Sequence, residues 1–175
     1  MKSESTTHTA KFDSLEQEAY LNLWRTYDRL RAVEDEFFTP YGLTAQQYNL
    51  LRLLRAAHPD RVPTLRLAQR LVSRAPDITR MLDKLSERGL IQRERPADNR
   101  RMVTVGITDA GLSLLAEMDN PLRESHLRQM GHLSVQELEQ LVALLQRARE
   151  PHEDREGIWA CSSSIESSSN KNVDR

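Results

Sequence analysis

The sequence lacks the features of disulfide-rich secreted proteins and of membrane proteins. It contains a single cysteine, Cys161, among 175 residues, which excludes an intramolecular disulfide framework and a metal site built from several cysteines. No apolar run approaches the roughly 20 residues needed to span a bilayer. The first residues, MKSESTTHTAKFDS, contain no apolar core of a signal peptide. We therefore expect a cytoplasmic protein that does not enter a membrane.

Glycine and proline are also scarce, with six and seven residues. They stand at apparent joints between amphipathic stretches, which favours a mostly helical protein. A chain of this length is most simply one domain with a real core. Residues 1–13 and the serine-rich residues 151–175 have the polar composition of disordered segments, so we expect the folded domain to span residues 14–150.

Motifs of enzymes and metal sites are missing from the sequence. We find no glycine-rich phosphate loop, no HExxH, no GxSxG and no plausible Cys/His arrangement. The five histidines are scattered, and His126 and His132 are six residues apart rather than at the i, i+4 spacing of a helical metal-binding pair. These absences argue against an enzyme and a metal sensor, and we expect no cofactor.

Charge is distributed unevenly along a chain whose formal net charge is only −1. Residues 61–101 contain eleven arginines and lysines against five acids, a balance of +6, so the rest of the chain carries −7. A basic middle between acidic flanks is typical of one localised surface that binds a polyanion. Solvated helix faces would give the same imbalance, and charge alone separates the two explanations weakly.

Capping patterns predict where three of the helices begin. A serine or threonine stands three residues before a glutamine or glutamate at Ser14–Gln17, Thr44–Gln47 and Ser134–Glu137, an arrangement that satisfies backbone donors at a helix N-terminus. Apolar residues follow at helical spacing, which predicts helices that run to about residues 38, 57 and 150. Thr108-Asp109 caps a further long helix that reaches Met130, in which Pro121 is expected to produce a kink or an interruption.

Two short helices are predicted in the basic middle of the chain. The first covers residues 65–72, and the tight joint Ser73-Arg74-Ala75 separates it from the second, over residues 76–88. Pro76 fits the first turn of the second helix, and Gly89 follows as a C-terminal cap. Apolar residues of this second helix fall at i, i+3, i+4 and i+7, which predicts one buried face made of Ile78, Met81, Leu82 and Leu85.

A β-hairpin is predicted directly after these helices. Residues 90–95 and 102–107 have the pattern of strands, with a turn over residues 96–99. Two short helices joined by a tight turn form a helix-turn-helix, whose second helix usually lies in a DNA major groove, and a hairpin that follows is a wing. We therefore expect a mainly α protein with a small β-hairpin wing. An arginine at the wing tip suits the narrow, negative minor groove.

Three segments of this region resemble the MarR (multiple antibiotic resistance regulator) family of bacterial repressors: TLRLAQRL from Thr64, DITRMLDKLSERGLI from Asp77 and DNRRMVTVGITDAG from Asp98. The resemblance extends over about residues 15–150. It implies a homodimer with a DNA-binding lobe over about 44–108 and dimerisation helices over about 14–38 and 109–150. It also implies that a small phenolic or anionic molecule binds between the lobes and weakens binding to the operator. Two subunits related by a two-fold axis would read a pseudo-palindromic double-stranded DNA site.

The candidate DNA contacts lie in the wing and in the second short helix. In the family, an Asp-x-Arg pattern lets the acid brace the wing arginine. Asp98 and Arg100 have this spacing, but an alternative alignment puts Asn99 in the place of the acid, so either Arg100 or Arg101 could enter the groove. In the helix, the residues off the buried face, with one that precedes it, are Arg74, Asp77, Thr79, Arg80 and Lys84.

The residues of the second short helix allow more than one role. Arg80 could read a guanine or touch a phosphate, because its guanidinium matches either geometry. Thr79 could meet a phosphate or a thymine methyl group. Asp77 could accept a hydrogen bond from cytosine or stabilise the helix N-terminus.

A ligand site could be lined by Trp24, Arg25 and Tyr27 in the first helix and by Tyr48 in the second. An arginine could hold a carboxylate, and an aromatic side chain could cover a ring. Aromatic residues at helical spacing also serve simply to pack helices, and the sequence leaves both roles open.

Two other functions compete with a ligand-responsive repressor. A winged helix can serve as a protein-interaction module that reads no DNA sequence, although the balance of +6 over residues 61–101 argues against it. An enzyme would need a catalytic arrangement, and isolated acids on helices do not provide one.

Overall fold

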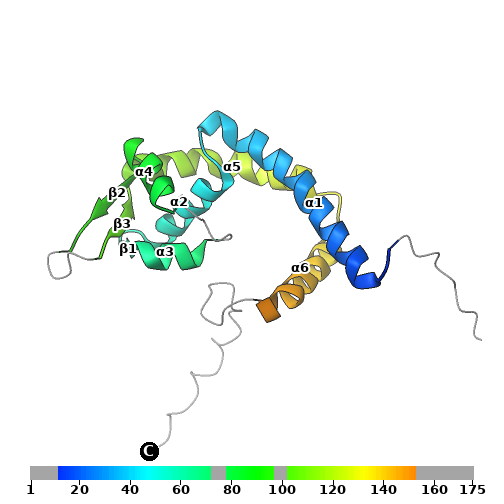
Figure 1. Cartoon of the computed structure of the whole chain (residues 1–175). Coiled ribbons are helices and arrows are strands. Elements are labelled where there is room, and N and C mark those ends of the chain that lie inside the picture. Colours follow the sequence, from blue (N-terminus) through cyan, green and yellow to red (C-terminus); the bar gives the residue numbers. More distant parts are fainter. Residues whose placement is uncertain (1–11, 72–77, 97–101, 153–175) are drawn as a thin grey trace, which may run out of the picture. The chain divides into compact units, whose positions relative to one another are not determined.

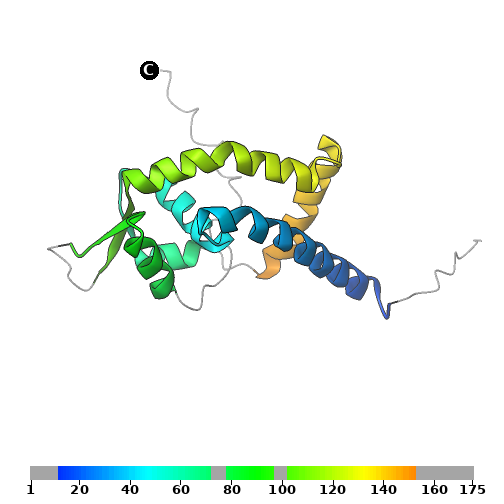
Figure 2. The same cartoon turned by 90° about the horizontal axis from the view of Figure 1, so that it is seen from above.

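The computed structural model describes residues 12–71, 78–96 and 102–152. The elements found there are mostly helices, with one small antiparallel sheet (Figures 1 and 2). Contacts divide the chain into two compact units, Met1–Leu43 and Thr44–Arg175. The fold class expected from the sequence, mainly α with a small β wing, is confirmed.

The first unit is built on one long helix, α1 (Leu15–Phe38). Its N-terminal cap is the predicted one, because the Ser14 hydroxyl accepts a hydrogen bond from the N–H of Gln17 at 3.1 Å. A 3-10 turn, η1 (Thr39–Tyr41), follows α1. Gly42 ends this turn with φ at 61°, in the left-handed region that glycine adopts without a steric penalty.

The second unit holds the other elements, in the order helix, strand, two helices, two strands and two helices. They are α2 (Ala45–Ala57), β1 (Val62–Pro63), α3 (Thr64–Arg70), α4 (Ile78–Glu87), β2 (Ile91–Glu94), β3 (Thr104–Ile107), α5 (Asp109–Met130) and α6 (Val135–Arg149), with a final 3-10 turn η2 (Glu150–His152). Figure 1 shows that β2 and β3 project together from the helices of this unit.

The sheet has three strands, with β3 between β1 and β2. Strands β2 and β3 form the predicted hairpin, in which Ile91 faces Ile107 and Glu94 faces Thr104. Strand β1 was not predicted, because its two residues are too few to show a strand pattern. Its Pro63 is compatible with the sheet because β1 is an edge strand, where a residue without an N–H breaks no ladder.

The core of the second unit is built from aliphatic side chains of four helices and the central strand. Completely buried side chains come from every one of these elements, and each contributes about 1.5–3 kcal/mol by leaving water. They include Leu50, Leu51 and Leu54 of α2, Leu67 of α3, Leu85 of α4, Val105 of β3, and Leu115 and Met118 of α5.

Three details differ from the sequence-based expectation. Helix α3 ends at Arg70, because Leu71 is already extended with ψ at 144°. Ile78 is only half-buried, whereas the other three members of the predicted apolar face are buried. Helix α5 contains Pro121 without interruption, and its ribbon is continuous in Figure 2. Buried residues on both sides of Pro121, Met118 and Leu122, hold the helix together despite the backbone hydrogen bond that a proline removes.

Candidate nucleic-acid interface

Helix α4 has one buried face and one exposed polar face. Met81, Leu82 and Leu85 are buried, and a helix that packs through one apolar stripe presents its opposite side to solvent. Thr79, Arg80 and Lys84 are exposed. The exposed face therefore carries a hydroxyl, a guanidinium and an ammonium group, which are the groups that contact phosphates and base edges in DNA.

The end of α4 fixes where the hairpin begins. Gly89 has φ at 68°, and its N–H donates to the carbonyl of Ser86 at 2.9 Å. The N–H of Leu90 donates to the carbonyl of Leu85 at 3.0 Å. This pair of bonds is a Schellman motif, which ends a helix with one defined change of direction. Since β2 starts at Ile91, the predicted glycine cap sets the angle between α4 and the hairpin.

Thr108 joins the same corner to the start of α5. Its hydroxyl donates to the carbonyl of Gly89 at 2.7 Å and accepts from the N–H of Gly111 at 3.1 Å. The first turn of α5 lies so close that a Cβ at Gly111 would overlap the carbonyl oxygen of Leu90 and stand 2.7 Å from Cγ1 of Ile107. Helices α4 and α5 and the hairpin are therefore packed against one another at a point where only glycine fits.

An ion pair connects the hairpin to the side of α4. Nη2 of Arg93 lies 2.6 Å from a carboxylate oxygen of Asp83, and among the described residues Nε of Arg93 is buried without a hydrogen-bond partner. Arg93 and Ile91 are on the same face of β2 because side chains alternate along a strand. Neither Arg93 nor Asp83 was among the residues predicted from the sequence to form the interface. The only signal was a charged residue at an inward-facing position of a strand.

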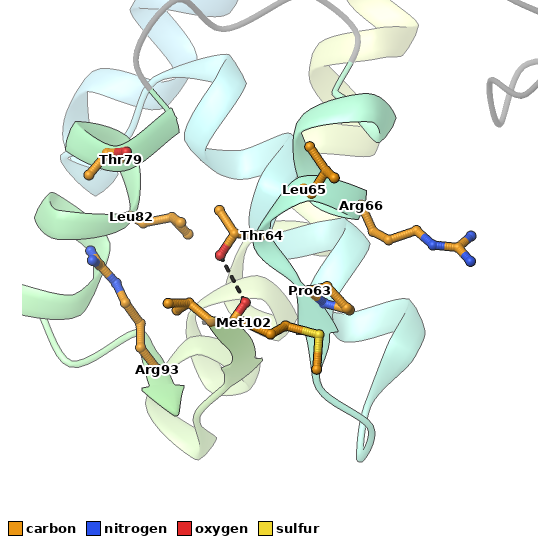
Figure 3. A pocket seen from close by; sticks show the side chains of 9 residues that line it. Pro63, Thr64, Leu65, Arg66, Thr79, Leu82, Arg93 and Met102 are labelled. Atoms are coloured by element: carbon orange, nitrogen blue, oxygen red, sulfur yellow. Dashed lines mark hydrogen bonds between the residues drawn. The ribbon is translucent and has the colours of Figure 1, made fainter. Parts of the chain in front are cut away.

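A groove of about 670 Å³ lies between α3, α4 and the sheet. Figure 3 shows the Arg93 guanidinium and Thr79 on one side, with Met102 on the floor and Arg66 pointing away. The Thr64 hydroxyl donates to the carbonyl of Val103 at 3.1 Å, and so joins α3 to the wing. The groove is otherwise lined by Pro63, Leu65, Leu82 and Val103. Because the Arg93 guanidinium is already paired with Asp83, the part of this region that suits an anionic partner such as a phosphate is the exposed polar face of α4 beside the groove.

Outside the described residues lie four of the predicted DNA contacts, Arg74, Asp77, Arg100 and Arg101, and the predicted wing brace, Asp98. The residues on either side of the wing turn are described. Strand β2 and Arg95-Pro96 lead to residue 97, and Met102-Val103 lead from residue 101 into β3. The DNA contacts of the four residues and the bracing role of Asp98 remain predictions.

The four candidates for a ligand site belong to different units. Trp24, Arg25 and Tyr27 are exposed on α1, with Trp24 60% and Tyr27 57% accessible. Tyr48 is half-buried on α2, and burial raises the pKa of its hydroxyl above the usual 10.0. Nη1 of Arg55, also on α2, donates to both carboxylate oxygens of Asp119 on α5, at 2.9 and 3.0 Å.

No helix in the described part of the chain is long and apolar enough to cross a membrane. Over the same residues, no group of three or more histidine, cysteine, aspartate or glutamate side chains could hold a metal ion.

Two short helices followed by a hairpin make this chain a winged helix-turn-helix protein. The model of the MarR family matches residues 43–103. A MarR transcription factor from Planctomyces limnophilus is 54% identical, with 78% of this chain and 98% of that chain covered and a TM-score of 0.63.

Two more distant structures share the fold. A mutant MarR from E. coli complexed with operator DNA is 22% identical, with 77% and 98% of the two chains covered and a TM-score of 0.66. Bordetella bronchiseptica BpsR, whose DNA binding is regulated by 6-hydroxynicotinic acid, is 23% identical, with 81% and 99% covered and a TM-score of 0.70.

The chain belongs to the MarR family, as the identity over nearly the whole of the Planctomyces protein shows. It is therefore a DNA-binding transcriptional regulator and not an enzyme, and both of these expectations from the sequence are confirmed.

Proposed function

We propose that the protein is a homodimeric repressor that acts in the cytoplasm, reads a pseudo-palindromic operator, and is released by a small aromatic or anionic ligand. One observation carries the proposal: the exposed polar face of α4 stands beside a hairpin that Gly89, Thr108 and Gly111 hold at a fixed angle to it. A helix and an extended hairpin in fixed relation match the alternation of major and minor grooves on one side of B-DNA.

In this proposal α4 enters the major groove. Thr79, Arg80 and Lys84 face the bases and the phosphates, with Arg74 and Asp77 contributing at the start of the recognition helix. The wing carries Arg100 and Arg101 to the minor groove, and Asp98 braces one of them. The E. coli structure with operator DNA supports this use of the fold.

Apolar side chains on the outer helices support a homodimer. On α6, Val135 is 73% and Val142 52% accessible, and Tyr20 and Leu23 on α1 are similarly exposed. Large apolar side chains in such number are covered in a stable protein, and a two-fold interface covers the same patch on both copies. Half-sites in the operator would then be spaced by about one helical turn, roughly 10 bp.

The effector is proposed to be a small aromatic acid. The regulation of BpsR by 6-hydroxynicotinic acid supports this chemical class. On this chain Arg25 offers a guanidinium for a carboxylate, and Trp24, Tyr27 and Tyr48 offer aromatic faces. A ligand that binds the DNA-free form more tightly than the operator-bound form weakens DNA binding by the ratio of the two affinities.

A mobility-shift assay with the DNA upstream of the protein's own gene tests the proposal. We expect selective binding over scrambled competitor, and release by one member of a panel of aromatic acids. Equal affinity for specific and scrambled DNA at physiological salt would contradict a sequence-reading repressor. Such a result would favour a protein-interaction module instead.

The wing is tested with the double substitution Arg100→Ala/Arg101→Ala. Two lost phosphate or groove contacts should lower the slope of log affinity against log salt by about 2 and weaken binding at every sequence. The matched control is Arg147→Ala/Arg149→Ala on α6, which likewise removes two positive charges, from a helix outside the DNA-binding region. Unchanged binding by the folded double variant would show the wing assignment to be wrong.

A further inference from the structure

A second arginine crosses the outer face of the sheet. Arg61 stands immediately before β1, and its Nε lies 3.0 Å from a carboxylate oxygen of Glu94 on β2. Its Nη1 donates to the carbonyl of Gln92 at 3.4 Å. Because β3 lies between β1 and β2, the side chain spans the full width of the sheet to reach these partners.

Gly106 makes this path possible. Val62 pairs with Val105 in the antiparallel register of β1 and β3, so the next position outward places Arg61 opposite Gly106. A Cβ on Gly106 would stand 3.3 Å from Cγ of Arg61, which is tighter than an ordinary contact. A residue with a larger side chain would fill the space through which Arg61 reaches β2. Gly106 is buried even though it lies on the outer face, as expected for a position that an overlying side chain covers.

The two arginine pairs hold the wing from opposite faces. Side chains alternate along a strand, so Arg93 points to the inner face of β2 and Glu94 to the outer face. Arg93 binds Asp83 of α4, and Glu94 binds Arg61 at the start of β1. Glu94 is also the last residue of β2, so the outer pair acts at the end of the described hairpin that leads to the cationic turn.

We propose that Arg61 is a wing-positioning residue: by lying over Gly106 and binding Glu94, it fixes the direction of the hairpin and so places the wing arginines in the minor groove. This inference rests on the proposed DNA-binding function of the wing. Arg61 acts through Glu94, and it contributes to affinity without itself contacting DNA.

The direction in which one substitution changes DNA affinity distinguishes this role from a simple electrostatic effect. Glu94→Gln removes a negative charge near the DNA-binding surface, and general electrostatics would make DNA binding tighter. The positioning role requires weaker binding, because the carboxylate is the partner that holds Arg61. We expect Glu94→Gln and Arg61→Gln each to weaken operator binding by about threefold to tenfold, the range of coupling for a partly exposed pair. Arg31→Gln, which removes an arginine from an ion pair with Asp35 on α1, is the matched control and should leave affinity within about twofold.

Two further variants test the geometry. The exchange Arg61→Glu/Glu94→Arg restores an ion pair across Gly106 and should recover most of the lost affinity, whereas Arg61→Glu alone should be the weakest binder. Gly106→Val fills the path of the Arg61 side chain. The backbone at Gly106 lies outside the left-handed region, and valine is favoured in strands, so this variant should keep its thermal stability while binding DNA about as weakly as Arg61→Gln.

The measurements are operator affinity, thermal unfolding, and footprints of the full-length protein on operator DNA, with hydroxyl radicals to probe the minor groove and dimethyl sulfate at guanine N7 to probe the major groove. We expect protection of the minor groove to fall in the Arg61, Glu94 and Gly106 variants, while protection of the major groove by α4 persists. Equal or tighter binding by Glu94→Gln, with wild-type binding selective, would overturn the positioning role alone. A wild type without selective DNA binding would overturn the proposed function, and the inference with it.

Discussion

Helices α2 and α6 begin in the same way and lie in different surroundings. Both start with a complete capping box: the N–H of Thr44 donates to the Gln47 side chain at 2.9 Å, and the N–H of Ser134 donates to the Glu137 side chain at 2.8 Å. Helix α2 then buries Gln47, Leu50, Leu51 and Leu54. All fifteen residues of α6 are exposed or half-exposed. Local sequence therefore decides where a helix starts, while burial depends on what the rest of the molecule, or a second copy of it, supplies.

The largest expected effect is in the core of α2. Leu51 is completely buried, and its replacement by alanine leaves a cavity as well as losing apolar burial. We expect Leu51→Ala to lower the free energy of unfolding by about 3 kcal/mol, measured by denaturant titration at fixed protein concentration. Leu144→Ala on α6 is the comparison, because Leu144 is 59% accessible in the single chain. A loss for Leu144→Ala as large as that for Leu51→Ala in a monomeric protein would contradict the contrast between the helices.

The exposed apolar side of α6 is tested by adding a charge. Val142→Glu would place a carboxylate in the proposed two-fold interface, where burial of an unpaired charge is unfavourable. The dimer dissociation constant should rise by at least about tenfold, equivalent to about 1.4 kcal/mol, in sedimentation equilibrium. Gln140→Glu adds the same charge about 200° away around the helix and should change it little. A wild type that sediments as a monomer at micromolar concentration would contradict the dimer itself.

The two capping boxes should contribute alike. Thr44→Ala and Ser134→Ala each remove the hydroxyl that accepts a hydrogen bond at the third helical position, from Gln47 at 3.2 Å and from Glu137 at 3.3 Å. Each change should lower the opening free energy of its own helix by about 1 kcal/mol. Hydrogen exchange of the amides in α2 and α6 measures both. Thr44→Ser and Ser134→Thr keep the hydroxyl and should retain most of the protection. A loss confined to one helix would show that tertiary packing, and not the cap, decides local stability.

The smallest expected effect is a difference in pH dependence between the capping boxes of α2 and α6. The Ser134 hydroxyl and N–H donate to the Glu137 carboxylate and hold its pKa below the ordinary 4.5. A pKa that is lower in the folded state gives stability that is present above the unfolded value and is lost as the pH falls through the folded value. Gln47 occupies the equivalent position in α2 and does not titrate.

The first turn of α6 should therefore lose protection from hydrogen exchange as the pH falls below the ordinary carboxyl pKa of 4.5, while the first turn of α2 changes less. Glu137→Gln should remove this difference between the helices. If it persists in that variant, another group is responsible.

The sequence predicted elements better than it predicted the contacts between them. Caps at Ser14, Thr44 and Ser134 and the turn at Gly89 depend on neighbouring residues, and all four were predicted and are confirmed. Strand β1 was missed because two residues form no pattern and their partner lies some forty residues away. The ion pairs of Arg61 and Arg93 depend on the register of three strands and on the orientation of α4, neither of which a single sequence specifies.

The close approach at Gly111 makes α5 a rigid connection between the base of the wing and α6. The first turn of α5 lies against the carbonyl of Leu90 and the side chain of Ile107, with no room for a Cβ on Gly111. The last turn of α5 leads to α6. A helix of 22 residues is about 33 Å long at about 1.5 Å per residue. If the end of α5 next to α6 moved sideways by about 3 Å, the helix axis would therefore tilt by about 5° about its first turn, where the wing is attached. A movement at the far end of α5 would thus reach the base of the wing as a rotation.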